Sequence, residues 1–145
     1  MKLFSYGTLQ DLDVLDIVAS NEPFERLGPA YLENHQAKKL IGENYPVVVE
    51  KEGAKLHGVV ISSGSETFWK RVDFFEQDYL KKEVTVSLHN SPTRCFIFSE
   101  ESGKDISEEE WNFNEWHMRN QERNAYLERC RNFMDMFGKV ERAKW

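Results

Sequence analysis

The hydrophobic and polar positions at the start of the chain predict a strand, a tight turn and a short helix. Residues 2–6 are apolar-rich and stop at Gly7, which is the pattern of a strand that feeds a turn. Apolar residues then recur at helical spacing from Leu12 to Val18, so we predict a helix over residues 11–19. The chain therefore opens with a strand, turn and helix unit.

Short apolar runs, separated by Gly, Asn or Pro, fill the segment from Phe24 to Ile61. This close punctuation predicts the short strands of an antiparallel or barrel-like sheet. Gly58 interrupts the last run, and a glycine within a strand often marks a bulge or a close approach of two backbones. The predicted strands are Arg26–Leu32, Ala37–Ile41, Tyr45–Val49 and Lys55–Ile61.

A second helix and a hairpin are predicted after these strands. Ser65 can cap this helix, which should end near Glu76 because a new extended segment follows. The extended runs at 82–88 and 93–98 are typical of the two strands of a hairpin, which would complete the sheet. The apolar face of the helix is formed by Phe68, Val72 and Phe75.

A long C-terminal helix is predicted over about residues 107–137, lying across the sheet. Ser107 and Glu110 have the spacing of a capping box at its start, and Gly138 is placed to end it. An apolar stripe along this helix consists of Tyr126, Cys130, Phe133, Met134 and Phe137. Three aromatic residues crowd the first turns and either pack in the core or wall a pocket, namely Trp111, Phe113 and Trp116.

These elements indicate one domain over residues 1–145, since this length suits one core and no repeat, low-complexity tract or linker divides the chain. The content of 40% hydrophobic and 30% charged residues is that of a globular protein rather than a disordered one. The expected fold class is α+β, with a small mixed or antiparallel barrel-like sheet, short helices and a long C-terminal helix.

Charge, hydrophobicity and cysteine content limit the partners and the cellular compartment that we expect for this protein. The net charge of −6 and the absence of a long Lys/Arg run argue against binding to nucleic acid or anionic lipid. No stretch approaches the roughly 20 apolar residues that span a bilayer, and no charged-then-apolar leader follows Met1. Cys95 and Cys130 are isolated thiols, which suits a reducing compartment. We therefore expect a cytoplasmic protein without a nucleic-acid or membrane partner.

Two positions could carry chemistry, and each has an ordinary alternative. Gly7 lets the backbone approach a ligand, and the N–H groups of such a turn can bind an anion, although glycine turns are common after a first strand. Glu76 lies near Phe74, Phe75 and Tyr79, so burial and the negative helix end would raise the pKa of an inward-facing carboxylate toward that of a general base. A solvated helix-end carboxylate is the alternative. The four His residues are scattered, without the spacing of a metal site.

The order of several motifs along the chain favours the functional interpretation of Gly7 and Glu76 over the ordinary one. A Tyr-Gly-Thr-Leu turn follows the first strand, and the segment Asn44–Pro46, the strand with Gly58 and the Asp-Phe-Phe-Glu element at Asp73–Glu76 come after it. In this order the motifs resemble the γ-glutamylcyclotransferase-like superfamily, in its γ-glutamylamine cyclotransferase or AIG2-like (avirulence-induced-gene-like) branch. The resemblance covers about residues 2–98 and leaves the C-terminal helix outside it.

The resemblance implies a cofactor-independent enzyme, of acyltransferase or lyase type, that acts on a small γ-glutamyl amide. The α-amine of such a substrate attacks its own γ-carbonyl, which forms 5-oxoproline and releases an amine without a metal. By position, Glu76 is the implied catalytic residue, acting as base and then as acid, while turn N–H groups hold the oxyanion. The implied substrate-binding turn is Tyr6, Gly7, Thr8 and Leu9, and the candidates for the pocket wall, with aromatic packing as their alternative, are Tyr45 and Tyr79.

Two other functions stay open from the sequence. Gln77 stands where the family commonly has Gly, and the loop from Glu76 to Tyr79 is about one residue short, which would suit a non-catalytic module that binds a small metabolite. An interaction protein that docks through its C-terminal helix would instead require Trp111 and Trp116 to be exposed together. The oligomeric state, the amine and the group that binds the substrate α-carboxylate leave no recognisable pattern in the sequence.

Overall fold

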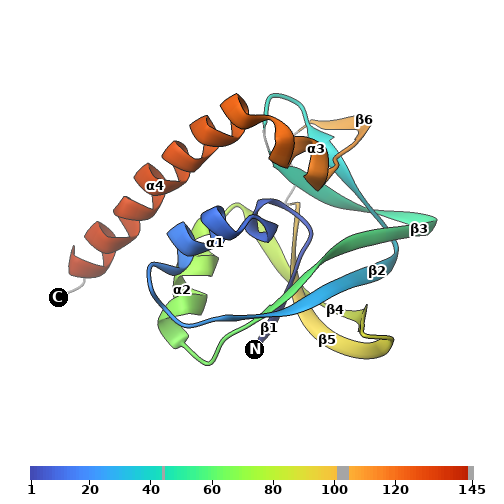
Figure 1. Cartoon of the computed structure of the whole chain (residues 1–145), viewed down its shortest axis with the longest axis horizontal. Helices are drawn as coiled ribbons and strands as arrows, with labels where there is room; N and C mark the ends of the chain where they lie inside the picture. Colours follow the sequence, from blue (N-terminus) through green and yellow to red (C-terminus); the bar gives the residue numbers. More distant parts are fainter. Residues whose placement is uncertain (44, 101–104, 144–145) are drawn as a thin grey trace.

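A barrel-like sheet organises the fold, and the computed structural model describes residues 1–43, 45–100 and 105–143. The strands are β1 Lys2–Ser5, β2 Glu25–Leu40, β3 Pro46–Ser62, β4 Tyr79–Leu88, β5 Ser91–Glu100 and β6 Ile106–Glu110. Their order is β3, β1, β5, β4, β2, β6, and β2 also pairs with β3, so the sheet closes on itself (Figure 1). β1 and β5 are parallel, and the other paired strands are antiparallel. The predicted α+β fold with a barrel-like sheet is confirmed.

Strands β2 and β3 correct the prediction of short strands between Phe24 and Ile61. The structure has two long strands here, because the residues that were expected to end strands form irregularities within them. Asn34 and Gly53 both have positive φ angles, 61° and 81°, and the N–H of Gly53 donates to Oδ1 of Asn34 at 3.0 Å. This contact bridges the interruption, and the pairing of the two strands resumes beyond it.

The predicted hairpin and the first two helices are present. β4 and β5 pair along their whole length and are joined by His89 and Asn90, whose positive φ angles suit a two-residue hairpin turn. The helices before β4 are η1 Thr8–Gln10, α1 Leu12–Ala19 and α2 Glu66–Phe75. Asp11 and Ser65 cap α1 and α2 through side-chain oxygens, and the cap at Ser65 is the one that the sequence predicted.

The prediction that the C-terminal helix starts near residue 107 is wrong. Ser107 to Glu110 form strand β6, followed by α3 Phe113–Met118 and α4 Asn120–Ala143. The N–H of Trp111 donates to the carbonyl of Ala37 on β2, and two lysines of β2 pair with two glutamates of β6. Capping is worth about 1 kcal/mol, so pairing with an available strand outweighs it here. The helical segment begins instead after Asn112, whose side chain accepts from the N–H of Glu115.

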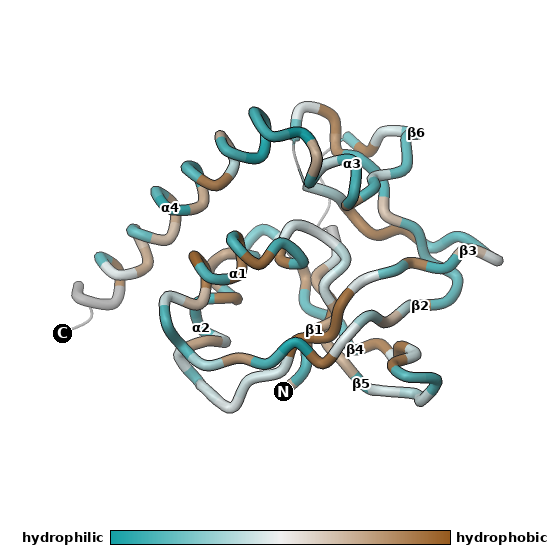
Figure 2. The backbone as a smooth tube through the Cα atoms, in the orientation of Figure 1, coloured by the Kyte–Doolittle hydropathy of each residue, from teal (hydrophilic) through white to brown (hydrophobic). Residues whose placement is uncertain are grey.

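Helix α4 also runs past Gly138, where the sequence predicted its end. Gly138 does not take a positive φ, and glycine ends a helix mainly by adopting that conformation. The apolar stripe is confirmed, and Figure 2 shows hydrophobic and hydrophilic residues alternating along α4. Helix α4 lies against α1 and α2 rather than directly across the sheet (Figure 1). Phe74 of α2, for example, stacks on Phe133 with ring centroids 4.9 Å apart.

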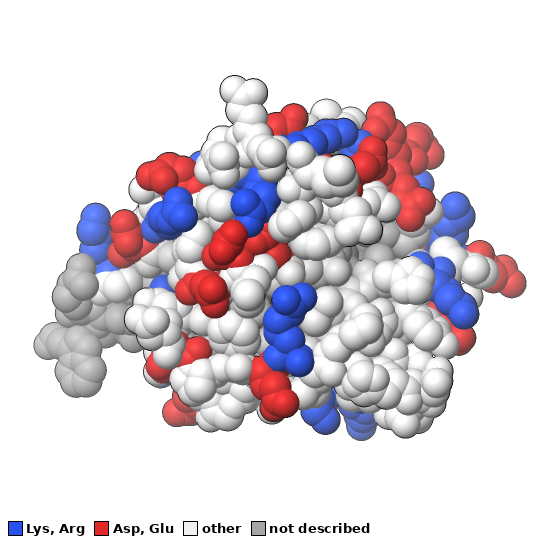
Figure 3. All heavy atoms as spheres, in the orientation of Figure 1, with Lys and Arg blue, Asp and Glu red and all other residues white. Residues whose placement is uncertain are grey.

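The aromatic residues near α3 belong to the core. Trp111 and Trp116 are only 7% and 4% exposed, and Phe113 packs against both. Their burial rules out the docking surface that would have required both tryptophans to be exposed. On the face shown in Figure 3, acidic and basic side chains are interspersed. None of the helices in the described ranges is long and apolar enough to cross a bilayer.

Candidate active site

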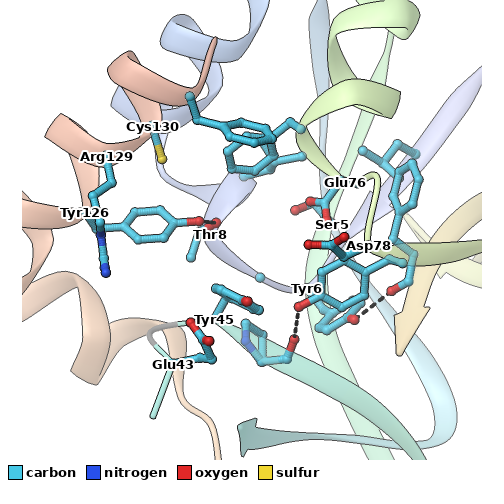
Figure 4. A pocket seen from close by; sticks show the side chains of 18 of the residues that line it. Ser5, Tyr6, Thr8, Glu43, Tyr45, Glu76, Asp78, Tyr126, Arg129 and Cys130 are labelled. Atoms are coloured by element: carbon cyan, nitrogen blue, oxygen red, sulfur yellow. Dashed lines mark hydrogen bonds between the residues drawn. The ribbon is translucent and has the colours of Figure 1, made fainter. Parts of the chain in front are cut away.

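A cavity of about 350 Å³ lies between the turn after β1, the loop after α2 and helix α4 (Figure 4). This volume is within the range of small-molecule sites. The structure brings all of the sequence-predicted site residues to its wall. They are Tyr6, Gly7, Thr8, Leu9, Tyr45, Glu76 and Tyr79. Asn44, which precedes the Tyr-Pro pair, lies outside the described residues.

The turn after β1 is held close to β3 by its glycine. A Cβ on Gly7 would lie 3.3 Å from the ring of Pro46, so a larger residue would push the turn away. The following residues form the short helix η1, in which the N–H of Gln10 bonds to the carbonyl of Gly7. The N–H groups that start a helical turn have no partner within it, so those of this turn are suited to bind a partial negative charge.

Gly58 of β3 sets the position of the strand that leads into this turn. A Cβ at this position would lie 2.3 Å from the carbonyl oxygen of Ser5 and 2.8 Å from the ring of Phe4. Of the bulge and the close backbone approach that the sequence offered for Gly58, the structure shows the close approach. Tyr6 comes directly after Ser5 in the chain. Its hydroxyl donates to the carbonyl of Phe98 on β5 at 2.6 Å, which fixes the other side of the turn.

Glu76 lies at the C-terminal end of α2 and faces the cavity (Figure 4). Its N–H donates to the carbonyl of Val72 and its carbonyl accepts from the N–H of Tyr79, so its backbone is fixed on both sides. Among the described residues, no hydrogen bond or ion pair reaches its carboxylate. Burial raises the pKa of Glu76 from 4.5 to about 8. The part of the side chain that stays accessible lines the cavity, so it is removed from bulk water.

The loop after Glu76 is supported on both sides. The hydroxyl of Tyr79 donates to the carbonyl of Pro46 at 3.1 Å, and its ring meets that of Tyr45 edge to face at 6.0 Å. Asp73 near the end of α2 forms an ion pair of 2.8 Å with Lys81. This pair links α2 to β4 across the loop.

Helix α4 completes the cavity, and sequence reasoning missed this contribution. Tyr126, Arg129, Cys130 and Phe133 all line it. Their spacing of three, four and seven residues places them on one face of a helix, and this was the available signal. The hydroxyl of Tyr126 bonds to Oγ1 of Thr8 at 2.8 Å, which ties α4 to the glycine turn.

A buried ion pair also holds α4 to the start of α1. The guanidinium of Arg123 donates to both carboxylate oxygens of Asp11, at 2.6 and 3.0 Å, and it also contacts Asp13. Burial acts to raise the pKa of Asp11, but the hydrogen bonds from Arg123 and the N–H of Asp13 outweigh it and leave that pKa below its ordinary value. Asp11 is therefore charged and paired at neutral pH.

Other reactive groups are less suited to catalysis. Burial raises the pKa of the Cys130 thiol to about 11, so this thiol is protonated near neutral pH and is a weak nucleophile. None of the four histidines lines the cavity. In the described ranges, no three His, Cys, Asp or Glu side chains are grouped as metal ligands. Glu76 is thus the group in the described wall whose pKa is shifted close to neutral pH.

The barrel-like α+β fold brings a glycine turn and the Glu76 carboxylate into one cavity of metabolite size. This arrangement is that of a small-molecule-binding domain with an acid–base group in its site. The family model described as "Gamma-glutamyl cyclotransferase, AIG2-like" matches residues 3–113. The chain therefore belongs to this family, as the motifs indicated. Because the match ends at residue 113, helix α4 lies outside it.

Similar proteins agree with this assignment. The chain is 26% identical over 125 residues to AIG2-like protein C of Arabidopsis thaliana, which covers 83% of this chain and 71% of the relative. A solution structure from Arabidopsis thaliana is similar over 99% of this chain and 91% of its own, with a TM-score of 0.63 and 24% identity. A crystal structure of an AIG2-like protein from Mus musculus covers 77% of this chain and 87% of its own, with a TM-score of 0.61 and 17% identity. At these identities the two structures support the fold alone.

Proposed function

We propose that this cavity converts a γ-glutamyl amide into 5-oxoproline and a free amine. The observation that carries the proposal is Glu76, a carboxylate with a pKa near 8 that faces the same cavity as the glycine turn. Family membership supports a γ-glutamyl substrate. The fold alone would not, since one fold can serve many reactions.

The pKa of Glu76 suits the first proton transfer. The α-ammonium group of a γ-glutamyl amide stands beside its own carboxylate, so its pKa is roughly one unit above the value of about 8 for a chain N-terminus. A carboxylate with a pKa of about 8, as for Glu76, can take this proton at a cost of about 1.4 kcal/mol. The freed α-amine then attacks the γ-carbonyl carbon and closes a five-membered ring. The N–H groups at Gly7 to Leu9 stabilise the oxyanion, each contributing about 3 kcal/mol to the transition state.

The second proton transfer completes the reaction. Glu76 gives its proton to the nitrogen of the departing amine while the bond between this nitrogen and the γ-carbon breaks, and it takes up the second proton that the ring nitrogen carries after the attack. This proton then passes to the released amine, which leaves as an ammonium ion, so Glu76 returns to its carboxylate form. The oxyanion reverts to the carbonyl of 5-oxoproline. The atoms and charges balance without a further reactant, because the substrate supplies both the nucleophile and the leaving group.

The same geometry supports an enzyme over a module that only binds a metabolite. Gln77 departs from the family pattern, but the bonds that fix Glu76 and Tyr79 on either side keep the loop in place. The carboxylate faces the cavity rather than bulk solvent. A binding module would have no need for an uncharged carboxyl group at this position.

The test is to incubate the protein with a panel of γ-glutamyl amides and to measure 5-oxoproline and free amine by mass spectrometry. We expect Glu76→Gln to lower kcat by a factor of about 100 or more, because general acid–base catalysis typically contributes this much. Glu66→Gln is the matched control, since it makes the same change at the exposed first turn of α2. Equal turnover by wild type and Glu76→Gln would refute the role of Glu76. No turnover by wild type across the panel would favour the metabolite-binding module.

A further inference from the structure

Helix α4 brings one cation to the described wall of the cavity, namely Arg129. It lies one turn after Tyr126, whose hydroxyl bond to Thr8 fixes the helix against the glycine turn. The guanidinium carbon is 5.7 Å from the centre of the Tyr126 ring, so the ring supports the cation at the edge of the cavity. The contacts that close the cavity therefore also hold the backbone of Arg129 at its edge, although the side chain is exposed.

Among the residues that the structure describes, Arg129 differs from the neighbouring arginines of α4 in having no acidic partner. Arg123 binds Asp11 and Asp13, and Arg131 pairs with Glu128 at 3.3 Å. Within the described residues, no carboxylate lies within ion-pair distance of Arg129. Its guanidinium can thus donate paired hydrogen bonds to a carboxylate that comes from outside the protein.

The cavity separates this cation from the catalytic carboxylate. Figure 4 shows Arg129 and Tyr126 on one side of the cavity, while Glu76 and Asp78 lie on the other. If the reaction is the one proposed above, the α-amine and the departing nitrogen both lie near Glu76, because both exchange a proton with it. The substituent on the departing nitrogen then extends away from Glu76, toward α4.

We propose that Arg129 is a specificity-determining residue that binds a carboxylate on the departing amine. The preferred substrate class is then a γ-glutamyl α-amino acid or short peptide, rather than a γ-glutamyl derivative of a neutral amine. This inference rests on the proposed function, and it assigns a substrate contact to a helix that lies outside the matched family region. Two hydrogen bonds from a planar guanidinium favour a carboxylate over an amide at this position, because only the carboxylate carries a charge.

A matched pair of substrates tests this role, γ-glutamylglycine and γ-glutamylglycinamide, which differ in one charge at the far end. We expect wild type to prefer γ-glutamylglycine, and Arg129→Gln to raise KM for it by about five- to tenfold with little change in kcat, as for loss of a partly exposed ion pair. Turnover of γ-glutamylglycinamide should change little. Arg129→Lys should keep part of the preference, since it keeps the charge but not the paired hydrogen bonds.

Arg131→Gln is the matched control, because it removes the same charge from α4 at a residue that does not line the cavity. An equal effect of Arg129→Gln on both substrates would overturn the inference, as it would indicate binding of the shared α-carboxylate or a structural role. An effect of Arg131→Gln as large as that of Arg129→Gln would overturn it too, because loss of any positive charge on α4 would then weaken substrate binding equally. Equal kcat/KM of wild type for both substrates would also overturn the inference, but it would leave the proposed function intact. Only a failure of wild type to release 5-oxoproline from either would count against the proposed function.

Discussion

Glu76→Gln keeps the shape of the side chain but removes its charge, so its effect on stability should depend on pH. In the unfolded chain the carboxyl group loses its proton near pH 4.5, whereas in the folded protein it keeps the proton up to about pH 8. Between these values unfolding releases a proton, and the folded state loses stability as the pH rises. Glutamine does not titrate, so the variant escapes this loss.

The size of the effect follows from the shift in pKa. One pKa unit corresponds to about 1.4 kcal/mol, so the shift of Glu76 from 4.5 to about 8 would destabilise the ionised folded protein by at most ~5 kcal/mol. Water that enters the cavity partly solvates the charge, which reduces this cost. We therefore expect the stability gained by Glu76→Gln to grow by about 2 to 3 kcal/mol between pH 5 and pH 8.

Urea unfolding of both proteins at pH 5, 6, 7 and 8, followed by tryptophan fluorescence, measures this difference. Glu52→Gln serves as the control, because it removes an exposed carboxylate from β3. Its difference from wild type should stay nearly flat over the same range. A flat difference for Glu76→Gln would refute the reasoning, since it would mean that the carboxylate is as well solvated in the folded protein as in the unfolded chain. A stability advantage of wild type that grows with pH would refute it more strongly.

Four further outcomes are expected. Turnover should be greatest slightly above pH 8 and fall on both sides, because the productive complex holds one proton between Glu76 and the substrate amine; a pH–rate profile of kcat/KM checks this. Gly58→Ala should destabilise the protein by about 3 kcal/mol in urea, since its Cβ would overlap the neighbouring backbone. Asp11→Asn should cost about 3 kcal/mol by the same assay, because it removes the buried one of the two carboxylates that pair with the guanidinium of Arg123. A double-mutant cycle of Thr8→Val and Tyr126→Phe should give a coupling energy of about 1 kcal/mol, and a value of zero would remove the link between α4 and the turn.

Elements with local signals were predictable from the sequence. The cap at Ser65 and the spacing of apolar residues define α2, and the structure places its end at Glu76 as expected. The hairpin of β4 and β5 follows from two alternating runs with a short turn. In both cases the residues that decide the structure are close together in the chain.

Elements that depend on distant partners were not predictable. Residues 106–110 form a strand only because β2 offers an edge and lysines to their glutamates, although their local pattern favours a helix start. The continuity of β2 and β3 depends on the contact between Asn34 and Gly53. Arg129 resembles an ordinary exposed arginine until the fold places it in the wall of the same cavity as a turn more than 100 residues earlier in the chain.

Strand β6 also bears on the tendency of this protein to aggregate in concentrated solution. It is the last strand in the sheet order, and within the described strands its side away from β2 pairs with no other strand. An open edge can add a strand from another molecule, which is a common route to aggregation. Here the edge carries Glu108, Glu109 and Glu110, with the first two side chains 102% and 72% exposed. Two such edges repel each other, so the strand that extends the sheet also limits edge-to-edge aggregation.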